Sequence, residues 1–137
     1  MKHWLIKSEP SSWSWDDHVK VGIEPWNGVR NYQAANNMKE MMIGDRAFFY
    51  HSVKEKRIVG IVEVACEYYP DHTDPTGRFG MVDFKAVKPL ETPVSLADIK
   101  ADPRLAELAL MKQSRLSVVP IDEASWKIIC AMGGIKA

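Results

Sequence analysis

The chain has 137 residues, of which 46% are hydrophobic and 26% charged, which is typical of a folded protein and excludes the composition of a disordered one. Its 18 basic and 18 acidic residues cancel, so the chain lacks the surplus of positive charge that tight, non-specific duplex binding requires. The length fits a single domain over residues 1–137, and no signal-peptide core or membrane-length apolar run is found, so a cytoplasmic protein without a membrane partner is expected.

The first elements predicted along the chain are a strand and two helices. Residues 4–6 form a short apolar run that predicts a core strand leading into a loop. Ser14 and Asp17 have the spacing of a capping box, which predicts a short helix. Asn31 is placed to cap a second helix, whose apolar positions extend over residues 32–42.

The middle of the chain has the composition of antiparallel strands. Residues 46–51 and 58–69 are rich in β-branched and aromatic residues, and the polar stretch 52–57 between them suits a hairpin. Turn-forming residues follow at 70–77, and the alternation over residues 81–86 predicts a third antiparallel strand.

The last third predicts short helices around one more strand. Helical patterns cover residues 95–99 and 102–109. Residues 115–119 predict a strand that ends at Pro120, and Asp122 is placed to cap a final helix. The whole pattern predicts an α+β domain with five or six mostly antiparallel strands. Such a sheet is expected to curl into a β-barrel flanked by short helices, because closure removes exposed edges.

Cysteine and histidine spacing does not indicate a metal site. Cys66 and Cys130 have no CxxC partner, so each is predicted to be a packed, free thiol. His3, His18 and His72 lack metal-ligand spacing with one another or with cysteine. Neither a metal nor a cofactor is therefore expected.

Four short segments place polar groups or aromatic rings at strand ends and turns, where sites are commonly built. They are Lys7-Ser8-Glu9, the turn carrying Trp26, Arg30, Asn31 and Tyr32, the pair His51-Ser52, and Arg115 with Ser117. An indole or a guanidinium stacks on a flat ring, and an Asn side chain offers both a donor and an acceptor. Each segment also has a structural interpretation: a solvated turn, a Trp that fills the barrel, an Asn that caps a helix, and a hydrogen-bonded structural His.

Residues 4–10, 26–34, 44–45 with 50–52, and 115–118, taken together and in order, resemble the EVE domain family over nearly the whole chain. The resemblance implies a PUA-like β-barrel, related to YTH and ASCH domains, whose pocket binds a modified base. The ligand-binding residues that the motifs and the resemblance indicate are Lys7, Ser8, Glu9, Trp26, Val29, Arg30, Asn31, Tyr32, His51, Ser52, Arg115 and Ser117.

Two departures from the family pattern bear on this site. Ala35 stands where the family usually has Arg, which removes one phosphate contact. The loop before residue 81 is short and lacks a Trp that is common in the family, which implies either a smaller wall on that side of the pocket or a wall in which Phe79 replaces the Trp.

The first functional hypothesis is a monomeric, non-catalytic module that binds a modified nucleobase of DNA or RNA. The first alternative is a hydrolase of modified nucleosides, as among ASCH relatives, with Lys7, Ser8, Glu9 and His51 as nucleophile and acid–base groups. The second alternative is a protein-binding adaptor, prompted by the neutral charge and the five tryptophans.

Overall fold

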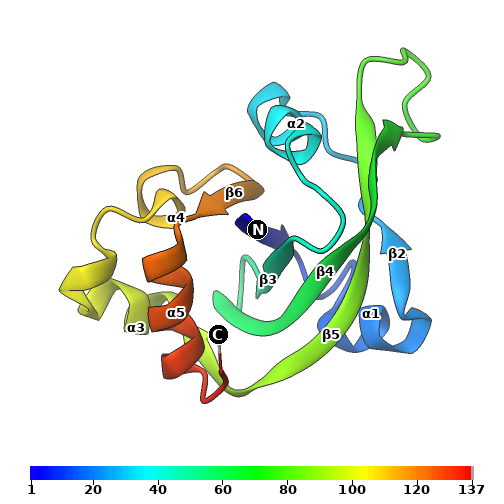
Figure 1. Cartoon of the computed structure of the whole chain (residues 1–137). Helices are drawn as coiled ribbons and strands as arrows, with labels where there is room; N and C mark the ends of the chain where they lie inside the picture. The colour runs from blue at the N-terminus through cyan, green and yellow to red at the C-terminus, as the bar shows by residue number, and fades with distance from the viewer. Residues whose placement is uncertain (137) are drawn as a thin grey trace.

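The computed structural model describes residues 1–136, which fold around one six-stranded sheet (Figure 1). Its strands are β1 (His3–Ser8), β2 (Ile23–Pro25), β3 (Arg46–His51), β4 (Arg57–Pro70), β5 (Gly80–Ser95) and β6 (Val118–Ile121). The helices are α1 (Trp15–Val21), α2 (Tyr32–Lys39), α3 (Leu96–Ala101), the 3-10 turn η1 (Pro103–Leu105), α4 (Ala109–Lys112) and α5 (Glu123–Met132). The predicted α+β class with short flanking helices is confirmed.

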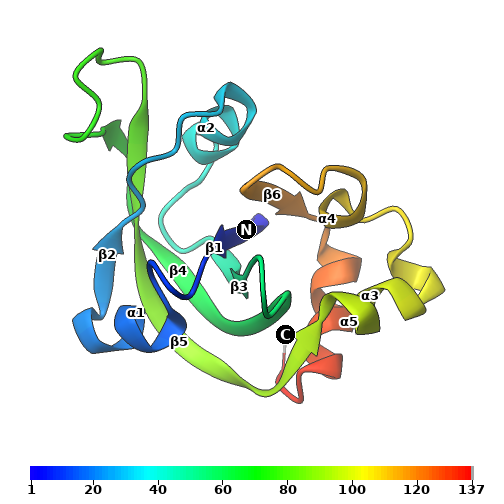
Figure 2. The same cartoon turned by 180° about the vertical axis from the view of Figure 1, so that it is seen from behind.

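The strand order is β2-β5-β4-β3-β1-β6. Strand β1 runs parallel to β3, and the other pairings between these strands are antiparallel. The sheet bends strongly, because register shifts recur along the β4–β5 pair and irregularities of this kind increase local twist. The two views in Figures 1 and 2 show β4 and β5 curving around β1 and β3. The outer strands β2 and β6 are not paired with each other in the described chain, so the expected barrel is an open one.

The core lies inside this bend. Consecutive residues of β1 and β3 are buried, among them Leu5, Ile6, Phe48 and Phe49. Burial on both faces of a strand requires cover on both sides, which the curved sheet and its helices supply. The predicted core strand at residues 4–6 is therefore confirmed.

Helix starts follow the predicted caps. Ser14 forms a capping box with Asp17, and Asn31 Oδ1 accepts a hydrogen bond from the Ala34 amide at 2.9 Å. Helices α3 and α5 begin in the same way, after Ser95 and Asp122. Each cap satisfies backbone N–H groups that have no partner within the helix.

Several predicted boundaries are wrong. The helix after Asn31 ends at Lys39, and residues 102–109 form η1 and the start of α4 instead of one helix. The last strand begins at Val118 and continues through Pro120, which is tolerated because β6 is an edge strand.

The two cysteines differ. Cys130 is buried on α5, as predicted, and burial raises the pKa of its thiol to about 11. Cys66 is exposed on β4, so its predicted packing is wrong. Of the helices in residues 1–136, none combines the length and apolar character that a membrane crossing needs.

A substitution at Gly60 of β4 tests how Trp15 of α1 packs on the sheet. A Cβ at this position would lie 2.6 Å from ring carbons of Trp15. The Trp15 ring also packs edge-on against Phe49, with 5.5 Å between the ring centroids. Gly60→Ala should therefore lower the free energy of unfolding by roughly 1–3 kcal/mol, measured by urea denaturation. The double variant with Trp15→Leu should lose less free energy of unfolding than the sum of the losses of the two single variants. Additive losses would show that Trp15 does not limit this position.

Candidate functional site

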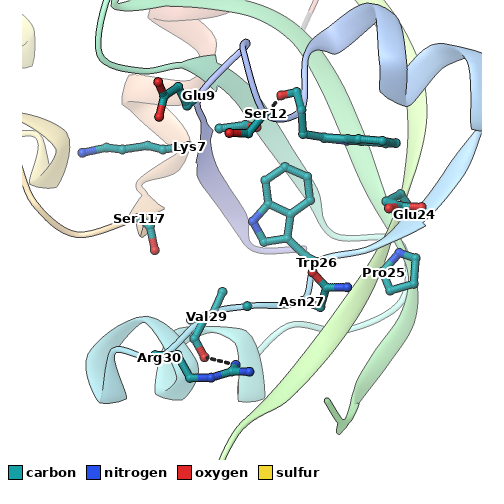
Figure 3. Close-up of a pocket in the computed structure, with 13 residues that line it drawn as sticks. Lys7, Glu9, Ser12, Glu24, Pro25, Trp26, Asn27, Val29, Arg30 and Ser117 are labelled. Atoms are coloured by element: carbon teal, nitrogen blue, oxygen red, sulfur yellow. Dashed lines mark hydrogen bonds between the residues drawn. The ribbon is translucent and has the colours of Figure 1, made fainter. Parts of the chain in front are cut away.

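A pocket of about 470 Å³ lies between the chain that follows β1 and the chain that follows β2. Small-molecule sites typically span roughly 300–1,000 Å³. Thirteen residues line the pocket, ten of which Figure 3 labels. They are Lys7, Ser8, Glu9, Ser12, Trp13, Glu24, Pro25, Trp26, Asn27, Gly28, Val29, Arg30 and Ser117.

The structure brings seven of the twelve predicted ligand-binding residues into this lining. These are Lys7, Ser8, Glu9, Trp26, Val29, Arg30 and Ser117. The other five, Asn31, Tyr32, His51, Ser52 and Arg115, lie outside it.

His51 and Asn31 have structural partners. The Trp15 amide donates a hydrogen bond to His51 Nε2 at 3.0 Å, so Nδ1 carries the proton and donates to Glu55 at 3.0 Å. That bond is the largest of the causes that lower the pKa of Glu55. His51 thus fixes the start of α1, as Asn31 fixes the start of α2.

The remaining three predicted residues, Ser52, Arg115 and Tyr32, do not line the pocket. The backbone amide of Ser52 donates to the Ser8 carbonyl at 2.9 Å. Arg115 is exposed in the loop before β6, and Tyr32 is exposed at the start of α2. Phe79, the candidate to replace a missing wall, contacts Tyr32 instead of lining the pocket.

Six lining residues were not predicted: Ser12, Trp13, Glu24, Pro25, Asn27 and Gly28. Four of them lie within two residues of Trp26: Asn27 and Gly28 belong to the 26–34 motif but were not selected as site residues, and Glu24 and Pro25 directly precede it. Trp13 was harder to identify as a pocket residue, because the sequence shows only that it lies between the loop after β1 and the capping Ser14. A turn there returns the chain to β1, because the Ser8 hydroxyl donates to the Trp13 carbonyl.

Trp26 is a half-buried ring held by the core. Its indole lies nearly perpendicular to Phe49 and Phe84, at centroid distances of 5.6 and 5.9 Å. Its backbone N–H donates to the Val82 carbonyl at 2.8 Å, which ties the loop to β5. Figure 3 shows the ring in the middle of the pocket, with Lys7 and Ser117 on one side. The ring is thus supported from behind and accessible from the cavity.

A second indole, Trp13, is positioned by the buried His18. Trp13 Nε1 donates to His18 Nδ1 at 3.1 Å, and His18 Nε2 lies 2.8 Å from the Phe84 carbonyl. Since Nδ1 accepts, Nε2 carries the proton and donates, which requires a neutral ring. The His18 ring also lies 6.0 Å from the Trp26 ring. Burial lowers the pKa of His18, which favours this neutral form.

Asp71 anchors the loop that carries Arg30. Its buried carboxylate accepts hydrogen bonds from the Gly28 amide at 2.8 Å, from Arg30 Nη1 at 3.1 Å, and from the amide and hydroxyl of Thr73. Burial alone would raise the pKa of Asp71, but these donors together lower it to about 2. The pocket loop is therefore joined to the β4–β5 loop through an ionised carboxylate.

Charge in the pocket is balanced. Lys7 and Arg30 contribute two cations, and Glu9 and Glu24 contribute two carboxylates. Lys7 Nζ donates to the Ser114 carbonyl at 2.8 Å, and partial burial lowers the pKa of Lys7. Such a lining suits the polar edge of an uncharged ring better than a cluster of phosphates. Over residues 1–136, no group of His, Cys, Asp and Glu is arranged to hold a metal ion.

Comparison with known proteins places this geometry in a family. The EVE domain model matches residues 2–132. Human thymocyte nuclear protein 1 is 33% identical over 164 residues, covering 95% of this chain and 73% of that protein.

Solved structures agree with this match. An NMR structure of a Rhodopseudomonas palustris protein is 57% identical, with a TM-score of 0.93 over 98% of this chain and 94% of that one. The human THYN1 protein in complex with DNA containing 5-methylcytosine is 30% identical, with a TM-score of 0.91 over the full length of both chains. An ASCH protein of Zymomonas mobilis, 12% identical with a TM-score of 0.59 over 96% of this chain and 99% of that one, shares the fold alone.

The neutral His18 ring predicts a loss of stability in acid. Its pKa in the folded chain lies below its ordinary value of 6.5, so the unfolded chain binds a proton first as the pH falls. The contribution of His18 to the free energy of unfolding should therefore be constant well above pH 6.5 and decline below it, by up to about 1.4 kcal/mol per pH unit, until the folded-state pKa is reached.

Urea denaturation at pH values above and below 6.5, compared between wild type and His18→Gln, measures this contribution. The pKa of His3 is also lowered by burial, so His3→Gln is the matched control and should remove a separate part of the slope. A slope that is unchanged in His18→Gln would contradict the assignment.

Proposed function

Because the chain belongs to the EVE domain family, we propose that its pocket binds one modified nucleobase of DNA. We propose further that it does so without catalysing a reaction. The observation that carries the proposal is Trp26, an aromatic ring fixed by the core inside a pocket of about 470 Å³ with balanced charge. A flat, uncharged ring with polar edges is the ligand that such a lining fits.

Stacking and edge recognition would supply the binding energy. A base on the Trp26 ring gains roughly 1–3 kcal/mol from stacking, which offsets much of the few kcal/mol needed to take it out of a base stack. The carboxylates of Glu9 and Glu24 suit an exocyclic amine, because carboxylates accept hydrogen bonds from the amino group of cytosine. Val29 and Pro25 contribute apolar side chains to the same lining, against which a methyl group would be buried.

The human THYN1 complex supports a methylated base in DNA. That protein is 30% identical to this chain over its full length and was solved with DNA containing 5-methylcytosine. We therefore take 5-methylcytosine as the first ligand to test and an RNA of the same sequence as the comparison.

The two alternatives have less support. The hydrolase hypothesis used Lys7, Ser8, Glu9 and His51. Lys7, Ser8 and Glu9 line the pocket, but His51 lies outside it, and the Ser8 hydroxyl donates to the Trp13 carbonyl. A proton carrier must come close to the reacting atom, and His51 is not placed to do so in this pocket. An adaptor needs an exposed docking face, whereas seven of the twelve predicted residues line a concave pocket.

The proposal predicts selective binding that depends on Trp26. Fluorescence anisotropy with labelled single-stranded DNA should show tighter binding when one cytosine is 5-methylated than when it is unmodified. Trp26→Leu, which keeps an apolar group against Phe49 and Phe84, should weaken binding at least about tenfold because the stacking ring is lost.

Trp126→Phe is the control, because Trp126 stacks on Phe48 beneath α5, away from the pocket lining. This variant should bind like wild type, with circular dichroism confirming that both variants fold. Equal affinity for methylated and unmodified DNA in wild type would refute the proposal. Stronger binding to the RNA would replace DNA with RNA as the ligand.

The balanced charge also predicts a weak dependence on salt. If Lys7 and Arg30 are the cations near phosphates, the slope of log affinity for single-stranded DNA against log salt concentration should be no steeper than about −1.4, since each neutralised phosphate of a single strand contributes about −0.7. A titration at several sodium chloride concentrations measures this slope. A much steeper slope would show that many phosphates are bound elsewhere on the surface.

A further inference from the structure

An exposed pair of aromatic rings lies next to the pocket but outside its lining. Tyr32, the first residue of α2, is 60% exposed, and its ring centroid is 4.9 Å from that of Phe79, at an interplanar angle of 35°. We refer to these two residues as the aromatic step. An exposed tyrosine held against a second ring presents a flat apolar surface to solvent.

The aromatic step is held in place from both sides. The Phe79 amide donates to Asp74 Oδ2 at 2.8 Å, and the amide of the next residue, Gly80, donates to the Tyr68 hydroxyl at 2.6 Å. Tyr32 is fixed by its place at the start of a helix that Asn31 caps. Rings that are ordered before binding lose little conformational entropy when a ligand stacks on them.

Arg30 links the aromatic step to the pocket. It lines the pocket, and its guanidinium carbon lies 5.7 Å from the Phe79 ring centroid. Asn31 is extended, with φ −97° and ψ 129°, so the Cα atoms of Arg30 and Tyr32 are at most about 7 Å apart. The aromatic step therefore begins two residues beyond a residue of the pocket lining.

The guanidinium of Arg30 has N–H donors and exposed surface left for a phosphate. It donates to the Val29 carbonyl, Asp71 and Thr73, which orient it and use part of its five N–H donors. Its side chain is still 40% exposed. A phosphate that joins a base in the pocket to a base on the aromatic step would lie beside this cation.

We propose that the aromatic step binds the base adjacent to the one in the pocket, so that the ligand is a nucleic-acid strand read over two consecutive nucleotides. The inference rests on the proposed function. Taking a base out of its stack leaves its neighbour without a stacking partner, and the exposed face of Tyr32 replaces that partner. Stacking of this kind tolerates any neighbouring base, because every base has an aromatic face.

Three DNA trinucleotides and four proteins test the inference by isothermal titration calorimetry. The ligands carry a central 5-methylcytosine with thymine flanks, a central 5-methylcytosine with abasic flanks, and a central cytosine with thymine flanks. The proteins are wild type, Tyr32→Ala, Tyr32→Phe, and Met42→Ala as a control at another exposed apolar residue, located between α2 and β3.

Wild type should bind the methylated trinucleotide with thymine flanks about tenfold more tightly than the one with abasic flanks. Tyr32→Ala should remove this difference without changing the affinity for the abasic ligand, whereas Tyr32→Phe and Met42→Ala should keep it. A difference that persists in Tyr32→Ala, or that is absent in wild type, would overturn the inference while methyl discrimination remains intact. Equal affinity of wild type for the methylated and the unmodified trinucleotide with thymine flanks would overturn the proposed function and the inference together.

Discussion

The pocket depends on a buried imidazole whose two nitrogens are both engaged. His18 accepts from Trp13 on one side and donates to the Phe84 carbonyl on the other, and this pair of bonds is possible only for the neutral ring. Phe84 lies on β5, and the same strand accepts the Trp26 amide at Val82. His18 and β5 therefore set the spacing between two indoles that line the cavity, and the polar groups around them gain a defined position relative to a stacked ring.

Features that need only neighbouring residues were predictable from sequence, and features that need the tertiary fold were not. A capping box involves two residues three positions apart, so Ser14 and Asp17 could be identified directly. Pro120 indicated the end of a strand, because nothing local shows that β6 lies at an edge of the sheet. Cys66 and Cys130 both suggested packed thiols, but none of residues 65–70 at the end of β4 is buried, and the hairpin that β4 forms with β5 protrudes from the molecule (Figure 1).

The same division applies to the site. Lys7 and Trp26 could be selected because motifs at strand ends are contiguous in sequence, and both line the pocket. His51 attracted attention as a polar group at a strand end, yet its partner is a backbone amide that only the fold brings near. His18 gave no signal at all, since its role depends on Trp13 five residues earlier and on the Phe84 carbonyl far along the chain. Chemistry that arises from a residue's partners is visible only when those partners are known.

The two supports of the site respond to acid in different ranges. The β4–β5 loop contains two successive Asp-x-Thr turns, in which Asp71 and Asp74 each accept from the amide and the hydroxyl of a threonine two residues later. The pKa of each carboxyl is lowered to about 2, so these turns lose stability only as the pH falls below the ordinary value of 3.8. The free energy that the neutral His18 ring contributes to stability declines already below 6.5, because the unfolded chain binds a proton there while the folded ring stays neutral. Mild acid therefore lowers the free energy of unfolding through His18 before it affects the turns at Asp71 and Asp74.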